Sequence, residues 1–475
     1  MTRKARPQLG SRRTKIVATL GPASSSYETL LELAAAGADA VRLNFSYGTG
    51  SQHRKMAELV RRVEAEIGRP LALIADLQGP KIRLGEIVTR TLEEGQKVVL
   101  ASAESAAADE LPITTPVVLE ALRRGHAVLI DDGAVRLKVE KAGKKRVTCT
   151  VLEGGEVSSH KGINLPGVSL PIASLTEKDK EDLALALELE VDFVALSFVR
   201  SATDVMELRR LIAARRSSAA IIAKIEMPQA VEALEEVIEA SDAVIVARGD
   251  LGVEAGQVAV PLLQKRIIAR ALESAKPVIT ATQMLESMVS CAEPTRAEAS
   301  DVANAILDGT SAILLSEETA IGAYPIEAVR FADEIARAVE PSLPYRHQLP
   351  RPDDEPTIGQ AVSNAACDVA EVLHAKAILA PTFSGKTPAA VARLRPKRPI
   401  VALSHHRYVL RQMALEWGVV PVEISACPNI ETLWTRSVEA ARRMGLLERG
   451  DRVVITAGTA VNVPGSTNVI KVEIA

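Results

Sequence analysis

With 475 residues, of which 47% are apolar, the chain can form two or three domains around a large buried core. Its net charge of −3, with both signs interspersed, and its 3% aromatic content argue against a nucleic-acid partner. No run approaches the ~20 apolar residues of a membrane span, so no membrane partner is expected either. Four scattered cysteines without metal-site or redox spacing favour a cytoplasmic protein. The basic start, Met1 to Arg13, lacks the apolar core of a secretory signal and is expected to be a disordered lead-in.

Eight short apolar runs recur along the first two thirds of the chain, and most are followed by a segment with helical spacing of apolar residues. The runs are 15–20, 40–46, 71–77, 191–199, 220–226, 243–250, 277–283 and 311–318, and the clearest helical segments are 27–36, 51–67, 178–189, 261–274 and 296–307. Near-continuous apolar strands that alternate with helices indicate a parallel sheet buried on both faces. Eight such units predict an α/β fold, a closed (β/α)8 barrel of the triosephosphate-isomerase (TIM) type.

The active site of such a barrel lies at the carboxyl ends of its strands. Polar residues that end the runs are therefore the candidate site residues: Arg42, Asn44, Ser46, Asp76, Ser197, Lys224, Glu226, Arg248, Asp250, Thr282, Gln283, Ser316 and Glu318.

Two segments interrupt the barrel pattern. Residues 83–170 carry short alternating runs separated by turn signals, which predict a small all-β module, expected as a β-barrel lid over the mouth. The Pro- and Asp-rich stretch 341–356 predicts a linker, and alternating strands and helices beyond it predict a separate α/β domain. We expect a discontinuous barrel of residues 1–82 and 171–345, a lid of residues 83–170 and a C-terminal domain of residues 346–475.

Glu226 and Asp250 end consecutive strands, where two carboxylates can share Mg²⁺ together with water and substrate oxygens. A single carboxylate at a barrel rim is more often paired with a nearby base. Lys224 favours the metal site, because a cation and a carboxylate on one strand face are costly to bury unless a ligand uses them. Arg42 and Arg83 suit a phosphate-bearing substrate, since guanidinium groups match phosphate oxygens; one arginine alone would more often form a surface ion pair.

Several longer segments closely resemble pyruvate kinase. They are 14–23 (TKIVATLGPA), 42–46 (RLNFS), 161–167 (KGINLPG), 224–226 (KIE), 246–252 (VARGDLG), 281–288 (ATQMLESM) and 294–305 (PTRAEASDVANA). The resemblance runs in order from about residue 13 to the end of the chain, and such long ordered strings are far more specific than a short motif.

The resemblance implies transfer of the phosphoryl group of phosphoenolpyruvate to ADP, which gives ATP and pyruvate. It assigns Mg²⁺, with Mn²⁺ able to substitute, to Glu226 and Asp250. It assigns the substrate carboxylate to the backbone at Gly249 and Asp250 and to the hydroxyl of Thr282, which is also a candidate for the proton path to the enolate. Lys224 would stabilise the transferred phosphoryl group.

Further roles follow from the same resemblance. Arg42 and Arg83 would clamp phosphates, and Asn44, Ser46 and Lys161 would help to place the nucleotide. Closing of the lid would bring Lys161 over the site and exclude water. Many family members bind K⁺ and have a residue with a hydroxyl group at the position of Leu77. In this sequence the hydroxyl ligand is absent at Leu77, and Lys81 brings a positive charge. We therefore expect no requirement for K⁺, with the ammonium of Lys81 as the substitute.

The C-terminal domain resembles the allosteric domain of the family. The loop residues Thr382, Ser384, Gly385, Lys386 and Thr387 can hold the phosphate of an allosteric effector, although a plain structural turn is the competing interpretation. A homotetramer is expected, as is usual in the family. Two other functions stay open: an enolate-stabilising aldolase or lyase on a similar magnesium barrel, and a non-catalytic metabolite sensor.

Overall fold

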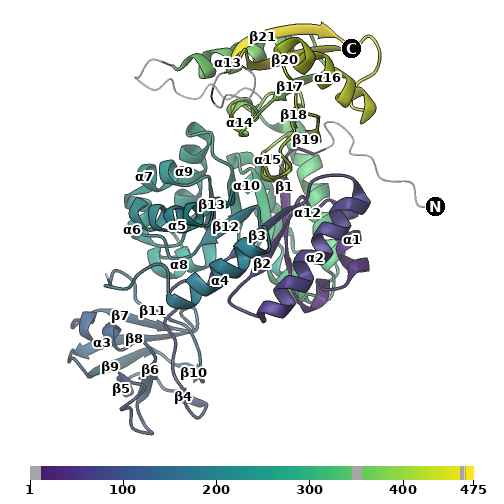
Figure 1. The fold of residues 1–475 in the computed structure, drawn as a ribbon. Coiled ribbons are helices and arrows are strands. Elements are labelled where there is room, and N and C mark those ends of the chain that lie inside the picture. Colours follow the sequence, from purple (N-terminus) through teal and green to yellow (C-terminus); the bar gives the residue numbers. More distant parts are fainter. Residues whose placement is uncertain (1–11, 169, 345–355, 461–464, 466) are drawn as a thin grey trace.

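The protein consists of three parts that follow one another in space: a C-terminal domain, a central barrel and a lid (Figure 1). The structure, a computed structural model, describes residues 12–168, 170–344, 356–460, 465 and 467–475. The predicted linker at 341–356 lies largely outside the described residues. Within the described ranges, no helix combines the length and the apolarity that crossing a membrane requires.

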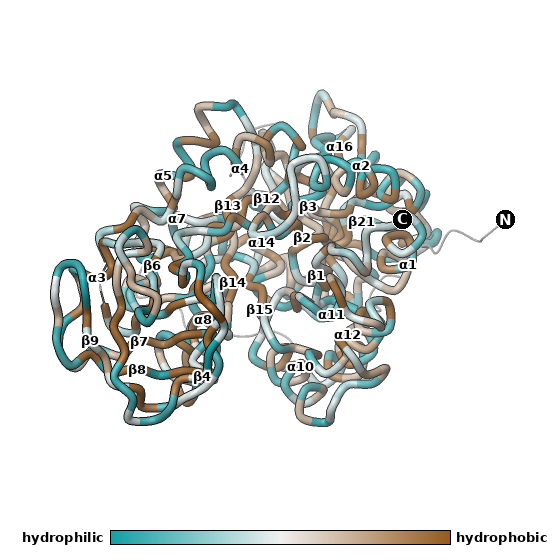
Figure 2. Tube along the Cα trace, turned by 90° about the horizontal axis from the view of Figure 1, so that it is seen from below, coloured by the Kyte–Doolittle hydropathy of each residue, from teal (hydrophilic) through white to brown (hydrophobic). Residues whose placement is uncertain are grey.

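The barrel is closed by eight parallel strands, as predicted. They are β1 (Lys15–Leu20), β2 (Ala40–Asn44), β3 (Ala72–Asp76), β12 (Phe193–Leu196), β13 (Ala220–Ile225), β14 (Ala243–Ala247), β15 (Val278–Ala281) and β16 (Ala312–Leu315). Nearly all their residues are buried because helices cover the outer face and side chains fill the interior, which explains the continuous apolar runs. The hydrophobic character of these strands is visible along their traces in Figure 2.

Helices connect and surround the strands. They are α1 (Tyr27–Ala36), α2 (Gly50–Ile67), α4 (Glu177–Glu188), α5 (Ala202–Ala214), α6 (Pro228–Glu232), α7 (Leu234–Ala240), α8 (Arg248–Ala255), α9 (Val260–Glu273), α10 (Arg296–Asp308), α11 (Glu317–Ala320) and α12 (Pro325–Val339), with short 3-10 turns η1 (Pro22–Ser24), η2 (Glu286–Val289) and η3 (Glu340–Ser342). Capping boxes begin several of them; Thr49 and Gln52 form one at α2, and Thr295 and Glu298 form another at α10.

Most predicted strands are longer than the observed ones, and the run 243–250 shows a cause. The run 243–250 was expected to be a strand with Arg248 and Asp250 at its end, but β14 stops at Ala247 and Arg248–Ala255 forms α8. The cause is hydrogen bonding to the loop after β15: the Gly249 N–H donates to Thr282 Oγ1 at 2.8 Å, and the Arg248 guanidinium donates to the Thr282 carbonyl at 2.7 Å. These bonds turn the chain out of the sheet, so Asp250 lies in the first turn of a helix.

The lid is built between β3 and α4 from short strands. They are β4 (Arg90–Leu92), β5 (Lys97–Ser102), β6 (Leu111–Ile113), β7 (Ala127–Ile130), β8 (Val135–Lys141), β9 (Arg146–Glu153), β10 (Gly155–Val157) and β11 (Ile163–Asn164), with one helix, α3 (Val117–Ala121). Six strands form a sheet in the order β11-β7-β8-β9-β5-β6, and β10 pairs with β4. Bridges from Arg83 to Gly162 and from Leu84 to Ile113 tie the two edges of the sheet together, as expected for a small β-barrel.

The C-terminal domain is a five-stranded sheet with helices on its faces. Its elements are α13 (Ile358–Val372), β17 (Ala377–Pro381), α14 (Lys386–Ala392), β18 (Ile400–Ser404), α15 (Arg407–Met413), β19 (Val419–Glu423), α16 (Ile430–Arg443), β20 (Arg452–Gly458) and β21 (Thr467–Ile474). The order is β19-β18-β17-β20-β21, and only β21 is antiparallel to its neighbour. The sequence analysis did not predict β21.

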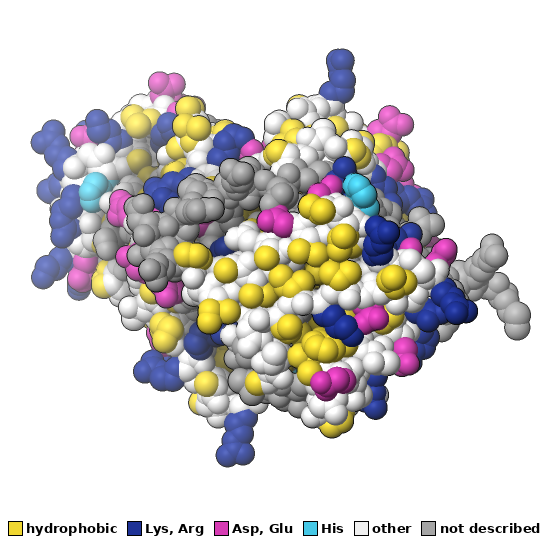
Figure 3. Space-filling model, turned by 90° about the horizontal axis from the view of Figure 1, so that it is seen from above, with side chains coloured by type: hydrophobic (Ala, Val, Ile, Leu, Met, Phe, Trp, Pro, Cys, Tyr) yellow, Lys and Arg dark blue, Asp and Glu magenta, His cyan; other side chains and the backbone are white. Residues whose placement is uncertain are grey.

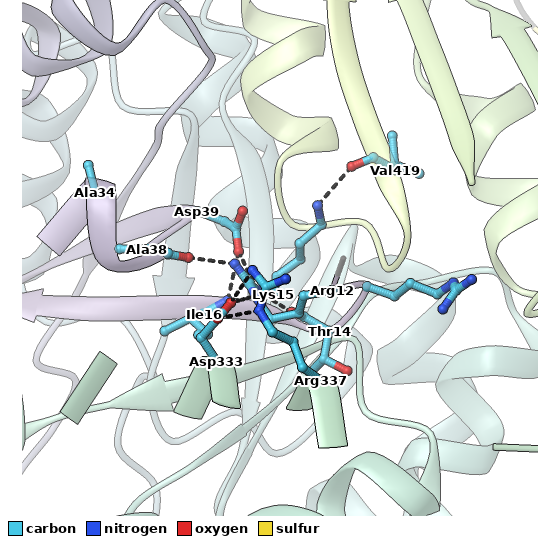
Figure 4. A network of polar contacts seen from close by, with 12 residues as sticks. Arg12, Thr14, Lys15, Ile16, Ala34, Ala38, Asp39, Asp333, Arg337 and Val419 are labelled. Atoms are coloured by element: carbon cyan, nitrogen blue, oxygen red, sulfur yellow. Dashed lines mark hydrogen bonds and ion pairs between the residues drawn. The ribbon is translucent and has the colours of Figure 1, made fainter. Parts of the chain in front are cut away.

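The C-terminal domain closes the amino end of the barrel. Ala414 and Leu415, which follow α15, belong to the same buried cluster as the barrel-interior residues Ile74 and Ile279. The ammonium of Lys15, at the start of β1, donates to the Val419 carbonyl at 2.8 Å (Figure 4). The two domains therefore share a core and hydrogen bonds at this end.

The expected lead-in is shorter than predicted. Residues 1–11 lie outside the described residues, but Arg12 and Arg13 are parts of the folded structure, so the prediction was wrong for them. Arg12 lies 2.6 Å from a carboxylate oxygen of Asp333 and 2.8 Å from one of Asp39, as Figure 4 shows. The reason is electrostatic: carboxylates buried at the amino end of the barrel need positive partners.

Candidate active site

A lysine lies at the centre of the polar groups at the carboxyl end of the barrel. Lys224 Nζ, on β13, is 2.8 Å from Glu226 Oε1, 2.8 Å from Ser197 Oγ and 3.4 Å from Asp76 Oδ1. The three partners follow or end neighbouring strands of the barrel. Burial opposes the charge of the lysine, but the carboxylates of Asp76 and Glu226 outweigh it and raise the Lys224 pKa. The ammonium is therefore charged at neutral pH.

Asp76 is shared between two cations. Its Oδ2 accepts from Arg42 Nε at 2.6 Å, and Arg42 also donates to Thr19 Oγ1 at 3.2 Å. Burial alone would raise the Asp76 pKa, but Lys224 and Arg42 overcome it, so the pKa is lowered. Arg42, Asp76, Lys224 and Glu226 are called the catalytic cluster below.

Glu226 and Asp250 place two negative groups beside each other. Glu226 is 1% exposed, and its Oε2 accepts from the Phe198 backbone N–H at 2.7 Å. Burial and, to a smaller extent, the negative charge of Asp250 raise the pKa of Glu226 to about 7, against the attraction of Lys224. A divalent cation would relieve this repulsion.

The donor set fits magnesium. In the part of the chain that the structure describes, no group of three or more His, Cys, Asp or Glu side chains could hold a metal ion. Glu226 and Asp250 therefore offer an ion two carboxylates at most. Mg²⁺ keeps several waters and is commonly bound through one or two carboxylates and the oxygens of a phosphate substrate.

Thr282 has an unusual backbone. Its φ angle is 72° and that of Gln283 is 52°, a conformation that β-branched residues rarely adopt. Arg248 holds it in place through the bond to the Thr282 carbonyl and an ion pair with Asp301 at 2.6 Å. The clamping role of Arg248 was missed by the sequence analysis; its position in VARGDLG and that of Asp301 in PTRAEASDVANA were the available signals. Thr282 and Gly249 are thereby joined at the same rim.

The residues predicted to bind the nucleotide lie in two separate parts of the structure. Asn44 Oδ1 accepts from the Ser46 N–H at 3.1 Å at the end of β2. Arg83 and Lys161 lie together at the base of the lid, where the Leu84 N–H donates to the Lys161 carbonyl at 2.9 Å. Lys161 Nζ pairs with Asp131 at 2.6 Å. These contacts of Arg83 and Lys161 are within the lid.

Lys81 lies in the segment between β3 and the lid, which is called the hinge below. It borders a cavity of about 60 Å³ between barrel and lid, which is also lined by Asn164 and Glu254. Asn164 Nδ2 donates to Glu254 Oε1 at 2.9 Å across the hinge. The contacts place Lys81 beside Gly162 rather than within the catalytic cluster.

Glu318 and Ser316 have structural partners. The two oxygens of Glu318 accept from the Ser316 N–H at 2.6 Å and from the Leu285 N–H at 3.1 Å, and burial raises the Glu318 pKa. Both bonds hold the loops that follow β15 and β16.

The predicted effector loop borders a pocket in the C-terminal domain. Thr382 Oγ1 accepts from the Gly385 N–H at 2.9 Å, and Gly385 has a φ angle of 84° just before α14 begins at Lys386. Thr387 and Ser384 line the pocket with Ser404, His405 and Ser425. Hydroxyl groups thus gather beside the loop.

Comparison with known proteins gives a consistent result along the chain. The family described as pyruvate kinase, barrel domain, matches residues 11–329, and the pyruvate kinase alpha/beta domain matches residues 360–473. Pyruvate kinase 2 of Synechocystis sp. is 44% identical over 98% of this chain and 79% of the relative. Pyruvate kinases of Geobacillus stearothermophilus (43%, covering 98% of this chain and 80% of the relative) and Mycobacterium intracellulare (45%, covering 98% of each) are similar.

Proposed function

Because the chain belongs to the pyruvate kinase family, we propose that Lys224, Glu226, Asp250 and Thr282 perform the reaction of that family at the carboxyl end of the barrel. The enzyme is a phosphotransferase that moves the phosphoryl group of phosphoenolpyruvate to ADP, giving pyruvate and ATP. The observation that carries the assignment of residues is the convergence of Lys224 with Asp76, Glu226 and Ser197 at one rim.

Positioned positive charge is the main contribution of these residues. During the transfer, negative charge spreads over the equatorial oxygens of the phosphoryl group. The Lys224 ammonium, fixed by three oxygen partners, needs no reorganisation to meet that charge. Arg42, held by Asp76, adds a second cation for the phosphate.

We assign a divalent metal to Glu226 and Asp250, and Mg²⁺ is the proposed ion, with Mn²⁺ able to substitute. When bound, the ion would neutralise charge on the substrate oxygens. Removal of divalent ions with EDTA should abolish pyruvate formation, and Mg²⁺ should restore it. The variant Glu226→Gln should need a higher Mg²⁺ concentration than the parent for half-maximal activity.

Thr282 and Gly249 are proposed to hold the substrate carboxylate. The Gly249 N–H donates to Thr282 Oγ1 at 2.8 Å, which places a hydroxyl and a helix N-terminus at one point of the rim. Thr282 is also a candidate for the proton path to the enolate carbon. The variant Thr282→Ser, which keeps the hydroxyl, should retain more activity than Thr282→Ala.

The lid is proposed to act with the nucleotide. Arg83 and Lys161 lie on adjacent segments at its base, so movement about the hinge would carry both toward Asn44 and Ser46. Closure would also exclude water that could accept the phosphoryl group. Lys161→Ala should raise the KM for ADP more than that for phosphoenolpyruvate.

Potassium independence is proposed from Leu77 and Lys81. Leu77 is buried and offers no oxygen ligand, and Lys81 supplies a positive charge at the hinge. Activity should persist when K⁺ is replaced by tetramethylammonium. The variant Lys81→Met, which removes the charge and supplies no oxygen ligand for K⁺, should be less active than the parent in either salt; loss of parental activity in tetramethylammonium would contradict the proposal.

Assembly, regulation and location are also proposed. Hydrophobic side chains gather on the C-terminal face of the molecule (Figure 3). Ile358 and Val372 on α13 and Val472 and Ile474 on β21 are exposed, which supports a homotetramer.

The hydroxyl-lined pocket beside Thr382 to Thr387 supports a phosphorylated effector. We place the enzyme in the cytoplasm, where the family acts in glycolysis.

One assay tests the proposed function as a whole. Pyruvate formation from phosphoenolpyruvate should require ADP and a divalent ion and should yield ATP in equal amount. Pyruvate or a cleavage product formed without ADP would instead indicate a lyase. Binding of metabolites without turnover would indicate a sensor.

A further inference from the structure

Arginine side chains also gather at the opposite end of the barrel from the catalytic cluster. A cleft with a volume of about 330 Å³ lies there between the barrel and the C-terminal domain. Its charged lining consists of five arginines and two glutamates: Arg61, Arg69, Arg407, Arg411, Arg443, Glu64 and Glu423. Both domains contribute arginines, and the lining carries more positive than negative charge.

The carboxylates of the cleft are already engaged. Glu64 accepts from Arg411 at 2.7, 2.9 and 3.1 Å, and Glu423 lies 3.5 Å from Arg407. Arg69 donates to two backbone carbonyls at 2.8 Å, and Asp39 is 3.9 Å away from it. Burial lowers the Arg69 pKa, as expected for a cation that is incompletely compensated.

Arg443 is the least compensated of the five. Among the residues that the structure describes, it has neither a hydrogen-bonding partner nor an ion-pair partner for its guanidinium group. It lies near the end of α16 and faces the same cleft as Arg69 of the barrel. The two groups together offer fork-shaped donors from two domains to one ligand.

The helix along the cleft links three parts of the protein. α15 begins at Arg407, two residues after His405, which lines the pocket of the predicted effector loop together with Ser404. Its residues Leu410 and Arg411 line the cleft, and Leu415 beyond it fills the amino end of the barrel. A ligand in the cleft would therefore contact the element that joins the C-terminal domain to the barrel.

We propose that this cleft is a second anion site, which binds a small phosphorylated molecule between Arg69 of the barrel and Arg407 and Arg443 of the C-terminal domain. Guanidinium groups match phosphate oxygens in a bidentate manner. Apolar lining from Leu410, Pro421, Val422 and Met444 gives a short carbon skeleton a surface to pack on. The bound anion bridges the two domains and favours the arrangement in which they are docked.

The test uses the full-length protein freed of divalent ions at low ionic strength, titrated with inorganic phosphate in a calorimeter. The double variant Arg407→Gln with Arg443→Gln removes two charges from exposed side chains, so folding should be preserved. The control, Arg210→Gln with Arg449→Gln, removes two charges from exposed arginines outside the cleft. We expect the parent and the control to bind one more phosphate than the cleft variant, or to bind it at least tenfold more tightly.

A second probe, glycerol 3-phosphate, distinguishes the sources of the anion. If glycerol 3-phosphate binds the cleft more tightly than inorganic phosphate does, the site is assigned to a phosphorylated metabolite. If the two bind equally, the site is assigned to free phosphate. The variant Thr387→Val should keep the cleft site, which separates it from the effector loop. The proposal is overturned if the cleft variant binds as many anions as the parent with unchanged affinity, or if the control loses as much binding as the cleft variant.

Discussion

The two ends of the barrel both carry buried ionic clusters, and they differ in how complete those clusters are. At the amino end, Arg12 is surrounded by acceptors from Asp39, Asp333 and Gly37. At the carboxyl end, Lys224 and Arg42 share Asp76, while Glu226 and Asp250 repel each other. The charge of Arg12 is compensated by protein groups, whereas the repulsion between Glu226 and Asp250 is proposed to be relieved by a bound ligand.

The difference follows from the energetics of buried charge. A buried ion is costly unless partners compensate for it, whether those partners are protein groups or a bound ligand. At the amino end the C-terminal domain covers the cluster, and its Val419 carbonyl accepts from Lys15. At the carboxyl end the lid is connected to the barrel through the segment that contains Lys81. The same residue types thus attach a domain at one end and are proposed to bind substrate at the other.

The sharpest way to break this comparison is to make the same substitution at both ends. Lys224→Met should leave a folded protein whose turnover is lowered by at least ~10³-fold, because a preorganised cation is lost from the transition state. Lys15→Met, the matched control, removes a buried lysine from the amino end and should change turnover by no more than about threefold, since no reacting group lies there. The measurement is ADP-dependent pyruvate formation by both variants.

Near-normal turnover of Lys224→Met would remove this lysine from the mechanism. A similar loss of turnover in both variants would mean that the two ends are not functionally distinct.

A second prediction concerns stability at the amino end. Arg12→Met removes the cation that Asp39 and Asp333 share. Asp333 keeps Arg337 at 2.5 Å, but Asp39 is left with Arg69 at 3.9 Å, so the free energy of unfolding should fall by about 3 to 5 kcal/mol, as for a broken buried ion pair. Turnover of the folded fraction should stay close to that of the parent. Urea unfolding, followed by the fluorescence of Trp417 near this interface, measures the change. A loss below about 1 kcal/mol would show that the cluster contributes little to stability.

Sequence patterns predicted the barrel because its strands are buried on both faces. The predicted and observed limits agree for β1 (Lys15–Leu20) and α1 (Tyr27–Ala36). Errors arise where side-chain contacts from another element override the local pattern, as at Arg248, whose partners follow β15. β21 was missed because only its first residue is fully buried, so its apolar pattern is weak.

The candidate residues at the carboxyl end were identifiable for a different reason. They follow apolar runs in a regular order, and parallel strands bring all their carboxyl ends to one rim. The amino-end cluster has no such signal, because Lys15 meets Val419 across some four hundred residues of sequence and Arg12 precedes the first strand. Alternation and spacing cannot reveal which distant segment supplies a partner. The cluster therefore became visible only in the folded structure.

A third prediction concerns the pH dependence of stability at the amino end. Asp192, near the amino end of β12, is buried, and burial raises its pKa to about 6 although Arg61 opposes the shift. The folded state then retains a proton that the unfolded state loses near pH 4, so stability contributed by this group falls as pH rises from about 4 to 6 and stays low above 6. Asp192→Asn removes that dependence and can still accept from the Leu73 N–H.

We expect Asp192→Asn to be more stable than the parent by roughly 1 to 3 kcal/mol at pH 7.5 and equally stable near pH 4. Urea unfolding at both pH values measures the difference. A variant that is less stable than the parent at pH 7.5 would mean that the ion pair with Arg61 outweighs the cost of burial.

The smallest expected effect concerns the ion pair that joins the two domains beside the anion cleft. Arg411 donates to both oxygens of Glu64, and both side chains are partly buried, at 16% and 14% exposure. A double-mutant cycle of Arg411→Gln and Glu64→Gln should give a coupling free energy of about 1 kcal/mol, above that of most exposed pairs because the geometry is bidentate. Salt should reduce the coupling only weakly, since the pair is shielded from solvent. A coupling near zero would mean that the C-terminal domain is attached by Arg13, Lys15 and the shared apolar core rather than by the rim of the interface.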